Sequence, residues 1–469
     1  MSNESAFERF PEELLVAIVH ELIEECKFNG GDFIAHLKAL RLSTARFAYL
    51  KLLNKTLFSR VKLVATQEHV ECIWKADANR IAPFARRVTF LPPPISWALT
   101  IVDFQKAVDA QAAAKGQDET SWSNVTPSSA EEGQGSMQIT DENQEKYGEY
   151  HTRALEFELF MEGPDLLKAW THALKALSGI HTVRFKCLEQ VSRSSWGDMV
   201  DRHSETRLYH EDPHLKETEY QRLAAPVGKL VFENGVAALA GAGNTIRQLD
   251  IHHASLGSLD VKSILNWEKL DLTQMHTLIF RPYIFDPQRD RTTGQLRIPA
   301  VLIDEANEDL NALLKKGSQN LRTFTHHGQI EDRPMAWPDC GAEGFPLPKL
   351  QQLKLDECEI LPLEFINWFM HMPALQHLEL ISNKVAGEYM NWDIIYDAIR
   401  RHPQGIRLDF DQIITSDATE ISINYHTLND VEERLQREES EDPWDDIDRS
   451  LPLYLSKRIE WNDCLEMWH

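Results

Sequence analysis

Cysteine is scarce in this sequence: there are six in 469 residues, and none belongs to a Cys-x-x-Cys pair. No histidine stands beside a cysteine at the spacing of a zinc finger. These gaps argue against both a disulfide framework and a cysteine-based zinc site. We therefore expect reduced structural thiols at Cys26, Cys72, Cys187, Cys340, Cys358 and Cys464.

Long apolar runs are also lacking. No stretch approaches the roughly 18 residues that a membrane span needs. Residues 1–10 have neither the basic flank nor the apolar stretch of a signal peptide. The sequence therefore predicts a soluble intracellular protein of the cytoplasm, the nucleus or both, without membrane contact.

Basic residues are fewer than acidic ones: the sequence has 49 Lys and Arg and 73 Asp and Glu, so its formal net charge is 49 − 73 = −24. No basic run offsets this acidity, so nonspecific binding to nucleic acid or anionic membranes is not expected. The 42% of hydrophobic residues is enough for most of the chain to fold. At about 100 to 200 residues per domain, the length predicts about three ordinary domains or one long repetitive domain.

Motifs of catalysis are missing as well. His20-Glu21-x-x-Glu24 opens like a zinc-protease helix, but a carboxylate stands where the second imidazole is required, so we predict a solvated helix face. Gly241-Ala-Gly243 lacks the third glycine of a dinucleotide loop and is better explained as a turn from helix to strand. Phosphate-loop and nucleophile-elbow patterns are absent. We predict no catalytic residue and no cofactor.

The N-terminal segment predicts three short helices. Pro11 suits a first helical position, and a wide apolar stripe follows it. Asp32 and Ser43 are expected to cap the second and third helices, and a short alternating segment at 61–63 closes the unit. About 50 residues make a marginal core, so another surface must help, either on the same chain or on a partner. The apolar residues of the three helices are Leu14, Leu15, Ile18, Val19, Leu22 and Ile23, then Phe33, Ile34, Leu37, Leu40 and Leu42, then Phe47, Leu50 and Leu53.

Two segments differ in composition from the rest of the chain. Residues 109–150 are rich in Gln, Ser, Thr, Gly and acidic residues, which predicts a disordered insert. Residues 430–448 form a second acidic stretch, and the apolar residues that follow it predict a C-terminal cap, so that 430–469 makes one unit.

A short pattern, apolar-x-x-apolar-x-apolar, recurs from Ala85 onward. The two clearest copies begin at Leu350 and Leu375, which are 375 − 350 = 25 residues apart, a period that fits a leucine-rich repeat. Weaker copies lie at Ile180/Val183/Phe185, Ile246/Leu249/Ile251, Met275/Leu278/Phe280 and Leu321/Phe324, with partial copies at Val88/Phe90 and Leu408/Phe410.

Segments with helical spacing separate these copies. They include Leu166/Leu167/Trp170/Leu174/Leu177, Leu310/Leu313/Leu314, Phe365/Ile366/Phe369 and Ile394/Ile395/Ala398/Ile399. One strand and one helix per 25 to 30 residues cannot bury an apolar face alone, so neighbouring units must stack. The sequence thus predicts an α/β protein with an irregular solenoid of short parallel strands and outer helices over 151–429, preceded by a connecting helix and first partial repeat over 64–108. A non-repetitive α/β domain is the alternative.

Two histidine pairs, His252-His253 and His326-His327, fall at the ends of strand copies. Neighbouring residues of a strand point to opposite faces, so each pair can supply one imidazole to a given face. Exposed polar strand residues are the simpler interpretation, and a metal site is the less favoured one; we predict no metal.

The chain reads Phe10-Pro11-Glu12-Glu13-Leu14-Leu15-Val16-Ala17-Ile18 near its start, and later Leu37-Lys-Ala-Leu40-Arg41-Leu42-Ser43-Thr44-Ala45-Arg46-Phe47 and Leu57-Phe58-Ser59-Arg60-Val61. These segments, within 7–63, resemble the F-box as found in fungal F-box proteins with poorly conserved leucine-rich repeats. The F-box opens Leu-Pro-x-Glu-apolar-apolar-x-x-Ile. Phe10 replaces the usual Leu, and the first connection, from Glu24 to Phe33, is longer than is common.

The resemblance implies that residues 1–63 are an F-box that docks on a Skp-family adaptor and a cullin scaffold. The chain would then be the non-catalytic substrate receptor of a ubiquitin ligase in the ubiquitin-like conjugation pathway. Leu15 and Leu22 are expected in the core of the unit. The expected adaptor contacts are Phe10, Pro11, Leu14, Ile18, Val19, Leu42 and Phe47.

The protein substrate would bind strand residues that alternate with the buried ones, on one face of the solenoid. Their mixed signs favour a protein partner with patterned charge. An interaction scaffold without a ligase role is the alternative function, and an unrecognised enzyme is the least favoured. The expected substrate contacts are Arg184, Lys186, Asp250, His252, Arg281, Gln352, Lys354, Asp356, His377, Glu379 and Arg407.

Overall fold

The computed structural model describes residues 10–29, 33–92, 141–186, 217–255, 261–283, 288–289, 296–297, 300–328, 335–336, 346–360, 362–381, 383–385, 395, 398–404, 406–411, 413–414 and 420–421. Within these ranges the chain is a mixed α/β protein built on one large parallel sheet.

A unit of four helices stands at the N-terminus: α1 (Glu12–Asn29), α2 (Phe33–Ser43), α3 (Ala45–Tyr49) and α4 (Lys51–Phe58). Three helices were predicted. Thr44, rather than Ser43, caps the third, because its side chain accepts a hydrogen bond from the Phe47 backbone N–H. Leu50 has an extended backbone (φ −64°, ψ 118°) that divides this segment into α3 and α4.

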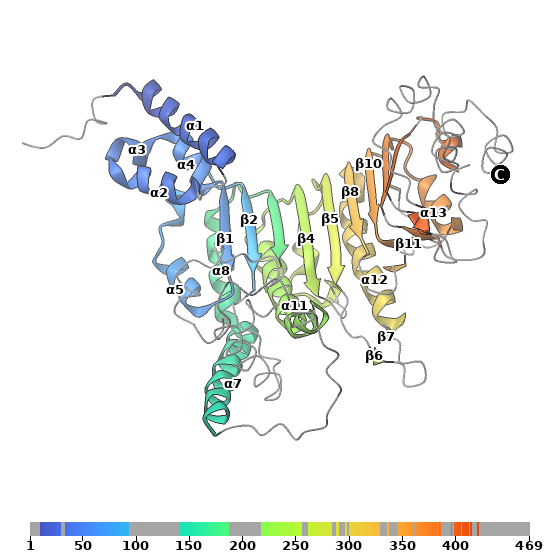
Figure 1. Cartoon of the computed structure of the whole chain (residues 1–469), viewed down its shortest axis with the longest axis horizontal. Coiled ribbons are helices and arrows are strands. Elements are labelled where there is room, and N and C mark those ends of the chain that lie inside the picture. The colour runs from blue at the N-terminus through green and yellow to red at the C-terminus, as the bar shows by residue number, and fades with distance from the viewer. Residues whose placement is uncertain are drawn as a thin grey trace, which may run out of the picture.

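Nine parallel strands form the main sheet, and neighbours in the sheet follow chain order. They are β1 (Arg60–Val64), β2 (Arg87–Leu91), β3 (Thr182–Lys186), β4 (Gln248–Ser255), β5 (Thr277–Tyr283), β8 (Thr323–His327), β10 (Gln352–Asp356), β12 (His377–Ile381) and β14 (Arg407–Asp411). Figure 1 shows them side by side. The segment at 61–63, assigned from sequence to the helical unit, is instead the edge strand β1, which pairs with β2.

The copies of the repeat pattern fall on these strands in matching register. Leu353 lies opposite Leu378, and Leu355 lies opposite Leu380. The same two positions hold Val183 and Phe185 in β3. Their side chains are buried, as the alternation predicts.

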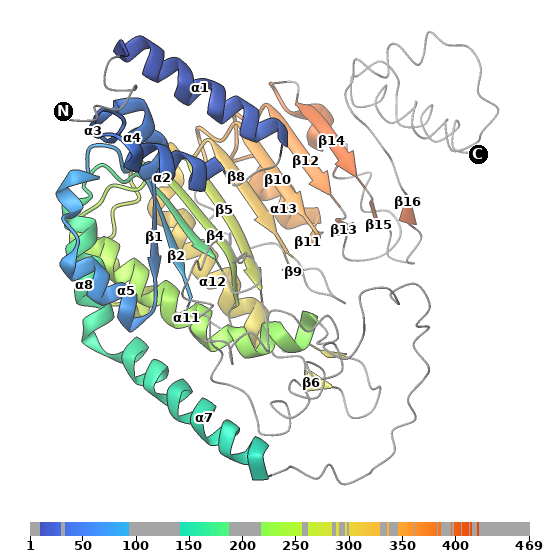
Figure 2. The same ribbon diagram turned by 60° about the vertical axis from the view of Figure 1, so that its left-hand side comes forward.

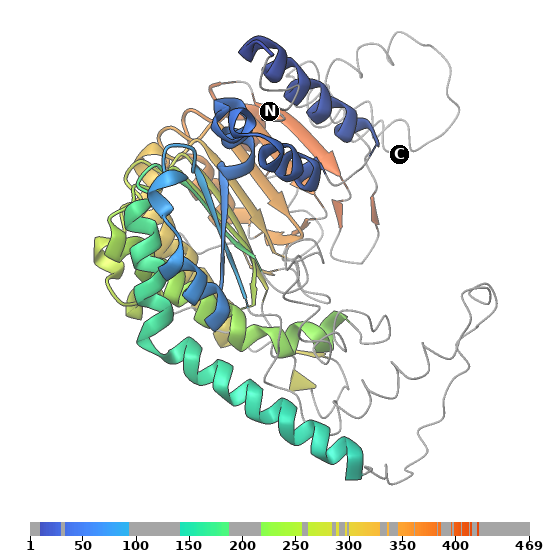
Figure 3. The same ribbon diagram turned by 90° about the vertical axis from the view of Figure 1, so that its left-hand side faces the viewer.

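Helices cover one face of the sheet (Figures 2 and 3). They are α5 (Gln67–Lys75), α8 (Pro164–Ala176), α11 (Glu217–Ala242), α12 (Ala300–Gly317) and α13 (Pro362–Phe369). Helix α7 (Asp141–Glu162) packs against α8 and α11 and extends away from the sheet. The connections also contain the short helices η2 (Ala78–Arg80), η5 (Val261–Ser263), η6 (Trp267–Lys269) and η7 (Ser318–Asn320). The predicted helical segments beginning at Leu166, Leu310 and Phe365 lie in α8, α12 and α13.

Two features of this layer differ from the prediction. Helix α7 begins at Asp141, so the last ten residues of the segment expected to be disordered, 141–150, are helical; residues 109–140 lie outside the described residues. Helix α11 was not predicted, although Val227, Val231 and Leu239 follow helical spacing.

Two smaller sheets complete the architecture. The first small sheet has five very short strands: β9 (Met335–Ala336), β11 (Cys358–Ile360), β13 (Lys384–Val385), β15 (Ile413–Ile414) and β16 (Glu420–Ile421). The second small sheet has two strands, β6 (Gln288–Arg289) and β7 (Leu296–Arg297). The expected C-terminal cap at 430–469 lies outside the described residues.

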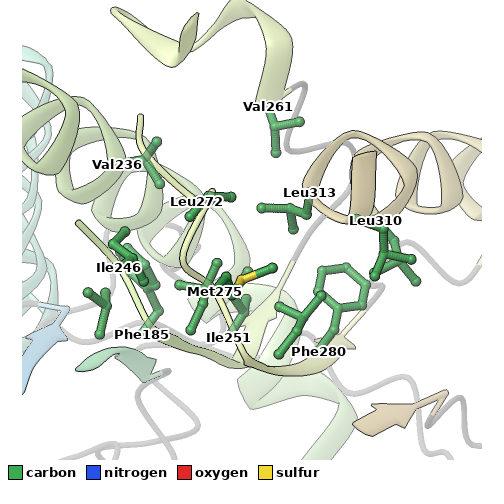
Figure 4. Packing of buried hydrophobic residues seen from close by; sticks show 14 of the residues in the cluster. Phe185, Val236, Ile246, Ile251, Val261, Leu272, Met275, Phe280, Leu310 and Leu313 are labelled. Carbon is green, nitrogen blue, oxygen red and sulfur yellow. The ribbon is translucent and has the colours of Figure 1, made fainter. Parts of the chain in front are cut away.

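The main core lies between the sheet and its helices. Phe185, Ile251 and Phe280 project from the strands toward Val236 of α11 and Leu310 of α12 (Figure 4). The helical unit has a separate core of its own: Leu15, Val19, Leu37, Phe47, Leu50 and Leu53.

Glycine ends α11 and also lets it approach the sheet closely. Gly243 has a φ of +72°, and its N–H donates to the Leu239 carbonyl at 3.0 Å, so the predicted turn from helix to strand is confirmed. Within α11, a Cβ on Gly235 would lie 2.5 Å from Cε1 of Phe185. That ring is itself stacked on Phe90 and packed against Phe232, so it has little room to move.

Replacing Gly235 with alanine should therefore destabilise the protein, even though alanine is the better helix former. We expect the free energy of unfolding to fall by about 1–3 kcal/mol, the usual cost of overpacking. Gly241→Ala is the matched control in the same helix, because its Cβ would only touch Thr171 at 3.4 Å. It should be neutral or slightly stabilising. Equal urea midpoints for the two variants would contradict this packing.

Candidate interaction surfaces

The helical unit exposes apolar side chains along α1 and at the end of α2. Leu14 is 50% exposed and Leu42 is 81% exposed. Pro11 is also exposed, while Phe10 and Ile18 are half-buried. Five of the seven expected adaptor contacts therefore reach the surface. Tyr49 of α3, which sequence reasoning did not select, is exposed as well.

The other two expected contacts, Val19 and Phe47, are corrected by the structure. Both are completely buried in the core of the helical unit, so neither can touch another protein while the unit is folded. Val19 lies one turn after Leu15, on the side of α1 that faces the other helices. Leu15 is buried as expected, and Leu22 is half-buried against the same core.

The face of the main sheet opposite the helices carries the strand residues that alternate with the core; we call it the polar face. Its register brings the expected substrate contacts together in two groups. The first group lies on β3, β4 and β5: Arg184 pairs with Asp250, and Lys186, His252 and Arg281 lie in one row across the three strands. The second group lies on β10, β12 and β14: Gln352, His377 and Arg407 lie in one row. In this second group Lys354 also pairs with Glu379, and Asp356 is the last residue of β10. Of His252 only the backbone is described.

Asp250 differs from the other members because its side chain is only 2% exposed. It accepts a hydrogen bond from Nε of Arg184 at 2.6 Å. Burial raises the pKa of the Asp250 carboxyl, and the positive charges of Arg184, Arg281 and Arg87 oppose that rise. A carboxylate this deeply buried presents little surface to a substrate, and Arg184 is its printed hydrogen-bond donor.

In the half of the polar face formed by β8, β10, β12 and β14, acidic side chains pair with a lysine or a histidine across the strands. Lys354 pairs with Glu379, and Nε2 of His377 lies 2.6 Å from Oδ2 of Asp409. Nδ1 of His327 lies 2.9 Å from Oδ2 of Asp356. Each acidic side chain described here thus has a basic partner on a neighbouring strand.

The half formed by β1 to β5 is strongly basic. Burial lowers the pKa of Lys62, and the charges of Lys186 and Lys38 lower it further. Burial likewise lowers the pKa of Arg87, helped by the charges of Arg60 and Arg184. Sequence reasoning missed the basic residues of β1 and β2. Their alternation with Val61, Leu63, Val88 and Phe90 was the signal that could have identified them.

The described histidine pair divides between the two faces. His327 lies on the polar face, whereas His326 points into the core and is fully buried. Its ring lies between those of Phe280 and Phe324, with centroids 5.8 Å and 6.2 Å away. Burial, with a smaller contribution from His327, lowers the pKa of His326 to about 3. The expectation that both residues are exposed is thus wrong for His326.

No group of metal-ligating side chains occurs among the described residues. In that same part of the chain, no helix has the length and apolar character needed to cross a membrane. No protein-family model matches this sequence, and no curated protein matches it. The fold places the chain in the broad class of mixed α/β proteins with a large parallel sheet.

Proposed function

We propose that this chain is the non-catalytic substrate receptor of a Skp/cullin/F-box ubiquitin ligase. The helical unit would be the F-box that binds a Skp-family adaptor, and the polar face would bind a protein substrate. The exposure of Leu14 and Leu42 is the observation that carries this proposal. Large apolar side chains left exposed on a small helical unit are typical of a protein-binding surface.

The arrangement of the sheet supports the second half of the proposal. Its strands follow chain order, and the steps between β8, β10 and β12 are 352 − 323 = 29 and 377 − 352 = 25 residues. These steps are typical of leucine-rich repeats, in which a row of parallel strands forms the ligand-binding surface. We therefore propose that residues 151–429 form an irregular solenoid of this kind.

A receptor of this type makes and breaks no bonds itself. It raises the local concentration of a substrate lysine near a ubiquitin-charged enzyme, which turns a bimolecular encounter into an intramolecular one. The helical unit and the polar face therefore need only to bind at the same time.

Adaptor binding tests the proposal directly. Leu14→Asp removes an exposed apolar contact without touching the core of the unit, whereas Ile18 packs partly against that core. Burying a leucine contributes about 1.5–3 kcal/mol, so we expect Leu14→Asp to raise the Kd for a Skp-family adaptor at least about tenfold. Affinity would be measured by titration calorimetry.

Leu159→Asp is the matched control, because Leu159 is 69% exposed on α7, outside the helical unit. It should bind the adaptor as the wild type does, and circular dichroism should show both variants folded. Equal affinity for Leu14→Asp and wild type would refute the assigned surface. Absence of binding by the wild type would remove the ligase role and favour an interaction scaffold.

A further inference from the structure

We propose that residues 451–469, the apolar part of the predicted C-terminal cap, fold back onto the outer side of α13. Residues 451–469 themselves lie outside the described residues. The contact is within one chain, so it goes beyond the proposed function and does not depend on it.

Helix α13 has apolar side chains on two opposite sides. Trp368 and Phe369 point inward and are buried in the main core. Leu363 and Met370 lie on the other side and are 72% and 71% exposed. The Met370 N–H donates to the Ile366 carbonyl at 3.1 Å, so the last helical turn includes Met370. Positions seven apart lie nearly above one another on a helix, so Leu363 and Met370 share one side.

Ile366 completes a row of three apolar side chains, which we call the outer stripe: Leu363, Ile366 and Met370. Ile366 is half-buried and lies three residues after Leu363 and four before Met370. A helix that is apolar all round is typically buried all round. Single exposed apolar residues are common, but a row of them on one helix is typical of a surface that another segment covers.

The described chain ends close to this helix. Strand β11 ends at Ile360, two residues before α13 begins at Pro362. It belongs to the same small sheet as β16, the last described element, and β13 and β15 lie between them (Figure 2). Three strand spacings of about 4.8 Å separate β11 from β16. From Ile421 to Leu451 there are 451 − 421 = 30 residues, and a chain of that length spans about 30 Å on average. Residues 451–469 can therefore reach the outer stripe.

The composition of residues 451–469 fits the outer stripe. Residues 430–448, which precede them, are acidic, so large apolar side chains begin only after this stretch. A segment tethered by about 30 residues has an effective concentration near its site in the millimolar range, far above that of a second copy in solution. The large apolar residues of the segment are Leu451, Leu453, Tyr454, Leu455, Ile459, Trp461, Leu465, Met467 and Trp468.

Oxidation of the full chain by hydrogen peroxide tests this contact, because a thioether reacts only where the oxidant reaches it. Met370 lies in the outer stripe, and the fully buried Met372 serves as the internal control of folding. Peptide mass spectrometry distinguishes the two. We expect Met370 to react at least about tenfold more slowly in the wild type than in a variant of the segment. That variant carries Leu453→Ser, Leu455→Ser, Ile459→Ser and Trp461→Ser.

The matched control has four substitutions in the acidic stretch and should protect Met370 as the wild type does: Glu438→Gln, Glu439→Gln, Glu441→Gln and Asp442→Asn. Rapid oxidation of Met370 in the wild type would overturn the proposal. Slow oxidation in the serine variant would do the same, because some other part of the molecule would then cover the outer stripe.

Hydrogen exchange tests the contact from the other side, and it decides the matter if the serine variant exposes Met372. Leu363→Asp alters an exposed side chain, so we expect α13 to stay folded while the amides of 451–469 exchange about tenfold faster. Leu265→Asp is the control, because Leu265 is 60% exposed between η5 and η6. Equal exchange of 451–469 in the two variants would overturn the proposal.

A second copy of the chain is the competing occupant of the outer stripe. Protection by a tethered segment does not depend on protein concentration, whereas protection by a second copy does. We therefore expect the wild-type rate of Met370 oxidation to be the same at about 0.5 μM and about 50 μM protein. Slower oxidation at the higher concentration would assign the outer stripe to an interface between copies and overturn the proposal.

Discussion

Replacing Arg184 with methionine is expected to lower the free energy of unfolding by about 3 kcal/mol. The change leaves the Asp250 carboxylate buried without the guanidinium that donates to it at 2.6 Å. Removing one member of a buried ion pair costs about 3–5 kcal/mol. The lower end applies here because Arg184 is itself one-third exposed and because Arg281 and Arg87 also lie near Asp250. Urea denaturation at pH 7 measures the loss.

The double variant Arg184→Met/Asp250→Leu is the control, because it removes both charges and keeps apolar volume between β3 and β4. It should recover most of the lost stability, since an apolar pair can replace a buried ion pair at little cost. A single variant that loses less than about 1 kcal/mol would show that the neighbouring arginines suffice for Asp250.

The His326→Leu variant should resist acid better than the wild type. The pKa of His326 is about 3 in the folded protein and about 6.5 in an unfolded chain. Between these values the unfolded state binds more protons, so the wild type loses stability as the pH falls below 6.5. At pH 4.5 this one residue costs about 3 kcal/mol. Leucine suits the site because the aligned positions on β5 and β10 hold Phe280 and Leu355.

The measurement is a set of urea titrations from pH 7.5 to pH 4.5 on both proteins. Carboxylates elsewhere titrate equally in the two, so the quantity of interest is the difference between their pH slopes. His327 and Asp356 lie next to the site and are unchanged in the variant. Parallel stability curves would mean that His326 is not held neutral by burial.

Local pattern predicted the strands well because their alternation is a property of the chain itself. Two buried leucines spaced two apart, as in Leu353/Leu355, require an extended segment with one apolar face. The helix stop at Gly243 was predictable for the same reason, since glycine favours a positive φ there. The third helix was predicted less well, because Leu50 has no local signal that makes its backbone extended.

The candidate surfaces were predicted less well, because exposure depends on what packs nearby. Val19 and Leu14 are similar apolar residues of one helix, yet Val19 is buried and Leu14 is exposed. The packing of α1 on the other helices decides between them. In the same way, Asp250 was expected on the surface but is buried beside Arg184, which lies 66 residues away in the chain.

By itself, the sequence determined most strands of the main sheet, several of its helices, and the alternation of core and surface residues along most of those strands. Those features follow from side-chain periodicity and backbone preference, which act over a few residues. Only the tertiary structure decided that 61–63 begins the sheet, that His326 lies in the core, and that Asp250 is buried beside Arg184. These outcomes depend on strand register between distant segments, because register sets which side chains become neighbours and which are removed from water.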